Sequence, residues 1–347
     1  MEQLRPQVNM TMGILPRQEI ISLVETGALM GLVEDDRAPQ LQPASLDLTL
    51  GQTAYRLRAS FLPGDQRSVM DALDAVTVHK IDLTGGAVLE TGCVYLIPLG
   101  QSLKLPQDVA GLANPKSSTG RLDVFTRVIC DRAGRFDDIP AGYEGPLYVE
   151  VAPRTFPVLV TTGQRLVQMR FRRGALQQLS TQTVSVNLKG EAPDAVIGYR
   201  ARRHAGLVDI GGIGAHKALD YWEPIMAPKG EIVLDPEEFY ILASKEAVSI
   251  PVDQAAEMAP IAPEIGEFRA HYAGFFDPGF GVEAAGGKGS KAVLEVRGRD
   301  VPFLLRHGQS IAKLIYEPLS GEPDTLYGAQ GSNYQAQGLR LSKHFTT

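Results

Sequence analysis

The stretch NPKSSTGRLDV, residues 114–124, gathers side chains of the kind that bind phosphate. Lys116 and Arg121 supply two cations, and the hydroxyl groups of Ser117 and Ser118 lie between them, followed by a glycine. The glycine gives the backbone freedom to turn its N–H groups toward an anion. Two cations, two hydroxyls and a flexible turn in one short segment fit a polyphosphate. The alternative is a polar turn on the protein surface.

Two glutamates stand in apolar, strand-like segments and are candidates for proton transfer. Glu150 lies in YVEVA and Glu295 lies in LEVRG. Partial burial in such a segment would raise the pKa of the carboxyl group toward values useful for a general base. The alternative is that each glutamate points outward from its strand into solvent.

Short strands must position these side chains, because helix-like patterns are scarce after the N-terminus. One amphipathic helix is expected over residues 16–30, with Gly27 near its end. The expected strands include ASLDLTLG (44–51), VYLIPL (94–99), GPLYVEVA (145–152), FPVLVTT (156–162) and RLVQMRF (165–171). Their alternation and their punctuation by Gly, Pro and Asp predict a mainly β protein, a barrel or sandwich rather than a parallel α/β sheet.

An internal repeat divides the chain. The segment VLETGCVYLIPLGQSLKLPQDVAGLANP from Val88 aligns with VLDPEEFYILASKEAVSIPVDQAAEMAP from Val233, an offset of 145 positions. The same offset returns in the segments around the two glutamates. We therefore expect two copies of one β domain, covering residues 1–180 and 200–347.

The second copy has lost the phosphate-binding residues. At the same offset, Ser118 meets Pro263 and Arg121 meets Gly266. A turn that the fold itself demanded would keep some of these residues in both copies. The loss therefore favours a functional site for which only the first copy supplies the phosphate motif.

Composition and charge limit the class of protein. A chain of 347 residues fits about two domains, and its formal net charge of −6 argues against a general binder of DNA or RNA. No apolar run approaches the roughly 18 residues of a membrane span, and the N-terminus lacks the apolar core of a signal peptide. The two cysteines, Cys93 and Cys130, make no disulfide framework. We expect a cytoplasmic protein.

Taken in order, the motifs resemble those of the dCTP deaminases, relatives of the trimeric dUTPases. PKSSTGR is similar to the family's phosphate motif, and IPAGYEGPLYVEV (139–151) and FFDPGFG (275–281) are both similar to its base-binding hairpin. YEPLSG (316–321) and SNYQAQG (332–338) resemble the C-terminal segment that closes over the nucleotide. The resemblance covers most of the chain as a fused duplication. It implies two tandem dUTPase-like β-barrel (β-clip) domains with a few short helices.

The resemblance implies hydrolytic deamination of dCTP to dUTP and ammonia, with a glutamate as the general base. We favour Glu150 over Glu295, because Glu150 belongs to the same copy as the phosphate motif, and Arg121 is expected to take part in catalysis. The substrate-binding residues implied are Lys116, Ser117, Ser118, Arg121, Arg132, Asp277, Tyr334 and Gln337. The alternative for Arg132 is a surface salt bridge, and for the two tail residues a disordered terminus.

A zinc-activated water is not expected in this site. Zinc deaminases carry a His-x-Glu and a Pro-Cys-x-x-Cys signature. Neither signature occurs in this sequence, and its six histidines are scattered. A Mg²⁺ ion would arrive with the triphosphate, held mainly by phosphate oxygens and water.

Several departures from the family pattern leave the nucleotide preference open. Lys116 replaces an arginine, so a bidentate phosphate contact becomes a point charge. AGRFDD (133–138) resembles an insertion before the first hairpin, EAAGGKGS (283–290) lengthens the second hairpin, and Asn333 stands where the family has a lysine. The alternatives are a dUTP diphosphatase, a bifunctional enzyme that forms dUMP, or a non-catalytic nucleotide sensor or scaffold.

The resemblance also bears on assembly. Family members form their sites between the subunits of a trimer. We therefore expect a homo-oligomer whose site draws on both copies, within one chain or between chains. dCTP is the expected ligand, dUTP and dTTP are further candidates, and no nucleic acid or membrane is expected as a partner.

Overall fold

The structure is a computed structural model that describes residues 12–32, 40–175, 177–190, 192, 195–260, 268–270, 274–283, 289–329, 334–335 and 337–346. Strands dominate, and the helices are few and short, so the prediction of a mainly β protein is confirmed. In the described part of the chain no helix has the length and apolar character needed to cross a membrane.

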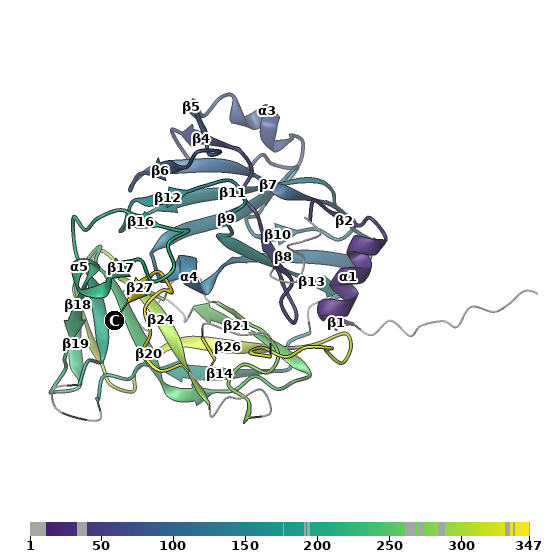
Figure 1. Ribbon diagram of the computed structural model, residues 1–347. Helices are drawn as coiled ribbons and strands as arrows, with labels where there is room; N and C mark the ends of the chain where they lie inside the picture. Colours follow the sequence, from purple (N-terminus) through teal and green to yellow (C-terminus); the bar gives the residue numbers. More distant parts are fainter. Residues whose placement is uncertain are drawn as a thin grey trace, which may run out of the picture.

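The elements up to residue 175 form the upper half of the molecule in Figure 1. Its helices are α1 (Arg17–Glu25), α3 (Val69–Leu73) and α4 (Ser117–Gly120). Its strands are β1 (Gly13–Ile14), β2 (Leu29–Met30), β3 (Leu46–Leu48), β4 (Thr53–Leu57), β5 (Thr77–Asp82), β6 (Ala87–Leu89), β7 (Val94–Lys104), β8 (Val109–Pro115), β9 (Val124–Cys130), β10 (Asp138–Ile139), β11 (Glu144–Pro153), β12 (Val158–Val160) and β13 (Val167–Arg173).

The remaining elements lie mostly in the lower half of Figure 1. They include one short helix, α5 (Ala218–Tyr221). The strands are β14 (Ser180–Ser185), β15 (Gly198–Ala201), β16 (Val208–Asp209), β17 (His216–Lys217), β18 (Trp222–Ile225), β19 (Glu231–Leu234), β20 (Phe239–Val248), β21 (Gln254–Pro260), β22 (Phe268–Ala270), β23 (Phe275–Phe276), β24 (Ser290–Gly298), β25 (Phe303–Arg306), β26 (Ser310–Pro318) and β27 (Phe345–Thr346).

The two halves pair their strands in the same way. The upper half has sheets ordered β1-β13-β8-β10 and β5-β4-β7-β11-β9, and the lower half has β14-β26-β21-β23 and β18-β15-β20-β24-β22. Even the register repeats: Glu150 lies opposite Leu96, and Glu295 lies opposite Ile241. The offset that relates the two sequence segments therefore also relates their strand pairings.

The N-terminal helix is shorter than the sequence predicted. It begins after Pro16 and ends at Glu25, and Leu29–Met30 instead forms β2, which pairs with β7. Gly27 stops the helix, because it takes a left-handed φ of +72° that a side chain would disfavour. The next N–H, of Ala28, then donates back to the carbonyl of Leu23 at 2.8 Å, which is the Schellman pattern of a helix end.

Chain segments cross between the halves. Strand β16 follows the expected boundary but pairs in parallel with β12 of the upper half. Trp222 and Phe345 are buried in the core to which residues before 175 contribute most of the side chains. The segment 180–185, which lies between the two expected copies, pairs with β26. These crossings hold the two halves together around the space between them.

Candidate active site

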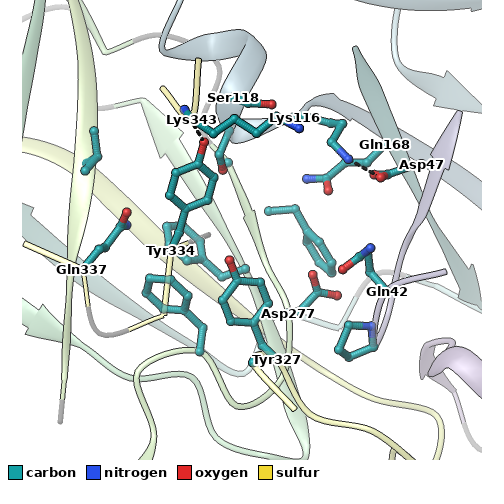
Figure 2. A pocket seen from close by; sticks show the side chains of 18 of the residues that line it. Gln42, Asp47, Lys116, Ser118, Gln168, Asp277, Tyr327, Tyr334, Gln337 and Lys343 are labelled. Carbon is teal, nitrogen blue, oxygen red and sulfur yellow. Dashed lines mark hydrogen bonds and ion pairs between the residues drawn. The ribbon is translucent and has the colours of Figure 1, made fainter. Parts of the chain in front are cut away.

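A cavity of about 320 Å³ lies between the two halves. Its volume falls within the range of small-molecule sites, roughly 300–1,000 Å³. Figure 2 shows Lys116 and Ser118 of the upper half at one end of it, and Asp277 and Tyr327 of the lower half facing them. Glu295 also lines it. The cavity therefore combines residues that the repeat had assigned to different copies.

The phosphate motif forms a single tight turn in this wall. Strand β8 ends at Pro115, and α4 follows at once, with the carbonyl of Lys116 accepting the N–H groups of Thr119 at 2.8 Å and Gly120 at 2.9 Å. The turn directs Ser117, Ser118 and Arg121 into the lining of the cavity. A side-chain atom added to Gly274 would lie 3.5 Å from the Ser117 hydroxyl, so the two halves are in contact here.

Glu295 lies directly against this turn. It is carried by β24, and a Cβ atom built on Gly120 would fall 2.2 Å from its Oε2 atom. Only glycine fits at position 120 while the carboxyl group keeps this place, because a carbon and an oxygen cannot approach so closely. Gly120 therefore allows the glutamate of the lower half to reach the phosphate motif of the upper half.

The surroundings of Glu295 favour its neutral form. Burial raises the pKa of its carboxyl group to about 8, with the charge of Asp123 adding to the rise and the cation of Arg121 opposing it. The Glu295 side chain is half-buried, because part of its surface is open to the cavity. A carboxyl group in this state can exchange a proton with a bound molecule near neutral pH.

Arg121 connects the turn to the C-terminal tail. Its Nη2 atom donates to Gln337 Oε1 at 3.0 Å, and its Nη1 atom donates to the carbonyl of Arg340 at 3.0 Å. The guanidinium group lies 4.0 Å from the centre of the Tyr334 ring, within the range of a cation–π contact. Burial lowers the pKa of Arg121, although an arginine side chain stays charged in proteins. The predicted tail residues Tyr334 and Gln337 are thus both in the cavity wall.

An ion pair between Asp123 and Arg297 lies next to Arg121 and Glu295 and joins the two halves. Asp123 follows Arg121 by two residues, and Arg297 follows Glu295 by two residues on β24. Arg297 forms an ion pair with the buried carboxylate of Asp123, and it also donates to Thr155 Oγ1 at 2.9 Å. This contact between the halves joins the turn between α4 and β9, which carries Arg121, to β24, which carries Glu295.

Asp277 joins the lower hairpin to the upper half. Its Oδ1 atom accepts the N–H group of Ala44 at 2.9 Å. Burial raises the pKa of this carboxyl group to about 7. The segment after Ala44 carries Asp47, which forms an ion pair with Lys116. Asp277 and Lys116, both predicted as binding residues, therefore both line the cavity.

Glu150 and Arg132 lie elsewhere. Glu150 is 1% exposed, does not line the cavity, and accepts a hydrogen bond from Arg127 Nε at 3.0 Å. Arg127 also lies 3.5 Å from the ring of Phe136, which belongs to the segment AGRFDD. Arg132 is exposed and outside the cavity lining. The sequence-based preference for Glu150 is therefore not favoured by its position, because its carboxylate is enclosed within its own half.

Other lining residues escaped the sequence analysis. Asp47, Arg165, Gln168, Tyr327 and Lys343 all face the cavity. Asp47 lies within ASLDLTLG, a segment expected as a strand but not as part of the site. Arg165 and Lys343 have no neighbouring motif, and only the fold brings them to Lys116. Within the described ranges, no group of three or more His, Cys, Asp or Glu side chains could hold a metal ion.

Comparison with known proteins agrees with this site. The family described as 2'-deoxycytidine 5'-triphosphate deaminase (DCD) matches through its N-terminal domain over residues 11–175 and through its C-terminal domain over residues 175–345. A dCTP deaminase of Haloarcula marismortui is 31% identical over 160 residues, which are 46% of this chain and 79% of that protein. This chain belongs to the dCTP deaminase family.

Two further relatives of the dCTP deaminase family extend the comparison. The crystal structure of 2'-deoxycytidine 5'-triphosphate deaminase from Agrobacterium tumefaciens superposes with a TM-score of 0.83 and 51% identity, covering 89% of this chain and 99% of that one. A protein of Dictyoglomus thermophilum named "dCTP deaminase, dUMP-forming" is 26% identical over 162 residues, 46% of this chain and 79% of that protein. The resemblance noted in the sequence is thereby confirmed.

Proposed function

We propose that this chain deaminates dCTP to dUTP and ammonia in the cavity between its halves, with Glu295 as the general base. The observation that carries the proposal is the contact between the Glu295 carboxyl group and Gly120 of the phosphate motif. It places a carboxyl group with a pKa of about 8 beside cations and hydroxyls suited to a nucleotide. Membership of the dCTP deaminase family names the substrate.

The chemistry then follows from what a carboxylate and a guanidinium group can do. Glu295 takes a proton from a water molecule as the water oxygen bonds to C4 of cytosine, and the electrons of the C4–N3 double bond move to N3, which accepts this proton from the Glu295 carboxylic acid. The carboxylate then takes the proton of the new C4 hydroxyl group and passes it to the exocyclic amine, the C4–N bond breaks, and ammonia leaves as the carbonyl forms. Arg121, held by Gln337 and Tyr334, is placed to fix the water and the base beside Glu295.

The remaining site residues have binding roles in this proposal. Lys116, Ser117 and Ser118 contact phosphate oxygens, while Asp277 lies where the hairpin would meet the base. A Mg²⁺ ion fits as a companion of the triphosphate, held by its oxygens and water. Zinc independence is part of the proposal and is tested with a chelator.

The larger organisation is also proposed. We infer two dUTPase-like β-barrel domains, and the repeated strand register supports this division. Residues 1–180 and 200–347 remain the proposed domains, with the tail and β16 crossing between them. A homo-oligomer is expected from the resemblance and a cytoplasmic location from the sequence composition, and both are open to sedimentation and fractionation measurements.

The test is an incubation of the purified protein with dCTP and Mg²⁺ in which ammonia, dUTP, dUMP and pyrophosphate are followed together. Ammonia with dUTP, unchanged by a zinc chelator and absent from Glu295→Gln, is the expected result. Ammonia with dUMP and pyrophosphate would show the bifunctional reaction, which the name of the Dictyoglomus relative makes the second candidate. Cleavage of dUTP without any turnover of dCTP would overturn the deaminase proposal.

A further inference from the structure

An arginine lies two residues after the proposed base and reaches the other half of the molecule. Arg297 follows Glu295 on β24, and Asp123 follows Arg121 at the same spacing in the turn after α4. The two form an ion pair in which the Asp123 side chain is 0% exposed and the Arg297 side chain is 12% exposed. A buried pair of charges therefore links the chain segments that carry the two residues of the proposed chemistry.

Further hydrogen bonds hold this ion pair in one geometry. Thr155 Oγ1 donates to Asp123 Oδ2 at 2.5 Å and accepts from Arg297 Nη2 at 2.9 Å. The Nη1 atom of Arg297 also donates to the carbonyl of Glu237. Asp123 takes a left-handed φ of +56°, which aspartate tolerates better than most residues, and its N–H donates to the carbonyl of Gly120 at 2.9 Å. The turn after α4 is thereby held against β24.

The ion pair accompanies Glu295 and not Glu150. At the offset of 145 positions, Arg297 corresponds to Ala152, which follows Glu150 by two residues and has no charge. A buried ion pair contributes little net stability compared with apolar residues of similar size, so packing alone does not account for Arg297. Its place beside the glutamate that faces the cavity points to a role in the reaction.

Asp123 is close enough to Glu295 to influence its ionisation. Burial raises the pKa of Glu295 most, the charge of Asp123 raises it further, and the cation of Arg121 opposes both. Two like charges at this range disfavour each other, and a cation bound to one of them reduces the repulsion. Arg297 is such a cation, because it binds the Asp123 carboxylate directly.

Other charged and titratable groups also surround the site. The groups that act on the charge of Arg121, besides Glu295, are Tyr327, Tyr334 and Arg340. The further charged residues of the cavity lining are Asp47, Lys116, Arg165, Asp277 and Lys343. The variants compared below leave all of these groups in place, so a difference between variants reports on Asp123 and Arg297.

We propose that Arg297 is a positioning residue for deamination, which binds Asp123 across the two halves, holds Arg121 beside Glu295 and screens Glu295 from the charge of Asp123. The inference rests on the proposed function of Glu295. Without Arg297, the two carboxyl groups would have one cation fewer beside them, and Glu295 would hold its proton more tightly. Without Asp123, the cation of Arg297 would favour the ionised form of Glu295. Loss of packing alone would not produce these opposite effects.

The test follows proton release by Glu295 in Arg297→Gln, in Asp123→Asn and in the double variant. Denaturant unfolding is measured over a series of pH values with and without Glu295→Gln in each background, and the pH at which the difference levels off marks proton release by Glu295 in the folded protein. That pH is expected at about 8 in the unmodified protein. It should be roughly one unit higher in Arg297→Gln, roughly one unit lower in Asp123→Asn, and within about half a unit of the unmodified value in the double variant. The rise of kcat/KM for dCTP with pH should move in the same directions, so kcat/KM at neutral pH should fall about tenfold in Arg297→Gln.

Two further variants serve as controls. Arg297→Lys keeps a cation next to Asp123 and should behave like the unmodified protein. Arg200→Gln removes an arginine that pairs with Glu223 in the same sheet but outside the cavity lining, and should leave proton release by Glu295 unchanged.

The outcomes separate this inference from the proposed function. Because Arg297→Gln leaves Asp123 buried without its cation and can prevent folding, Asp123→Asn and the double variant then decide the matter. Shifts of both single variants in the same direction, or no shift in Asp123→Asn, would overturn the inference. Unfolding needs no turnover, so it decides this inference even where dCTP releases no ammonia and the proposed function fails.

Discussion

Glu295→Gln tests the central assignment because glutamine copies the shape of the protonated carboxyl group but cannot transfer a proton. The side chain should keep its place against Gly120, so the fold and nucleotide binding should survive. Loss of a general base costs roughly a factor of 10² to 10⁴ in rate. We therefore expect kcat for deamination to fall by at least about a hundredfold with KM little changed.

The same substitution should change stability in a pH-dependent way. In the folded protein the pKa of Glu295 is raised from 4.5 to about 8, so the folded state holds a proton that the unfolded chain releases. This favours folding below pH 4.5, and the advantage is lost as the pH rises toward 8. Full ionisation then costs about 5 kcal/mol, from 3.5 pH units at about 1.36 kcal/mol each.

Denaturant unfolding at several pH values measures this cost. Glutamine does not titrate. The free energy of unfolding of Glu295→Gln should therefore rise by about 4 kcal/mol relative to that of the unmodified protein between pH 5 and pH 9. Glu144→Gln is the control, because Glu144 is an exposed residue in a surface ion pair and its replacement should give a difference independent of pH. A constant difference for Glu295→Gln, or full activity of this variant, would refute the reasoning.

Three further outcomes follow from the site. If the ionised form of Glu295 is the base, kcat/KM for dCTP should rise with pH through an apparent pKa of about 8, and a profile that is flat from pH 6 to 9 would contradict this role. Gly120→Ala should reduce kcat/KM by more than about tenfold while circular dichroism stays native, because the new methyl group must displace the carboxyl group. Wild-type kcat/KM in this variant would show that the contact has no importance. Glu150→Gln should keep activity within about threefold and lose roughly 3 kcal/mol of stability, because the half-buried Arg127 would lose the counter-charge of a buried carboxylate. Abolished turnover in that variant with an unchanged denaturation midpoint would return the catalytic role to Glu150.

Much of the scaffold was predictable from local patterns. Alternating apolar residues marked the strands around Val94 and Val167, and an exact offset of 145 positions marked their counterparts. The phosphate motif was recognisable because its cations and hydroxyls are contiguous. The end of the first helix was misplaced because Gly27, which allows a left-handed turn, lies inside a stretch that otherwise has helical periodicity.

Local sequence patterns could not predict which of the two glutamates, Glu150 or Glu295, faces the cavity. Glu150 and Glu295 occupy the same register position, and their flanking residues are equally apolar. Their partners differ: Arg127 lies opposite Glu150 on β9, whereas Arg121 reaches Glu295 from the other half. Such a contact depends on how two β domains pack, and the pattern of each strand does not encode that packing. The same limit hid Arg165 and Lys343.

The arrangement explains why each half has lost a different part of the site. A cavity between the halves needs one phosphate motif, from the upper half, and one facing glutamate, from the lower half. The equivalent positions, which are the motif's counterpart in the lower half and Glu150 in the upper half, are therefore not needed for the site. In the upper half, Glu150 instead forms a buried ion pair with Arg127, and the guanidinium group of Arg127 lies against the ring of Phe136 in the segment AGRFDD. The counterpart of the phosphate motif begins at residue 261, outside the described residues. We therefore expect one nucleotide site of this kind per chain, and calorimetric titration with dCTP on the Glu295→Gln background should give one nucleotide bound per chain.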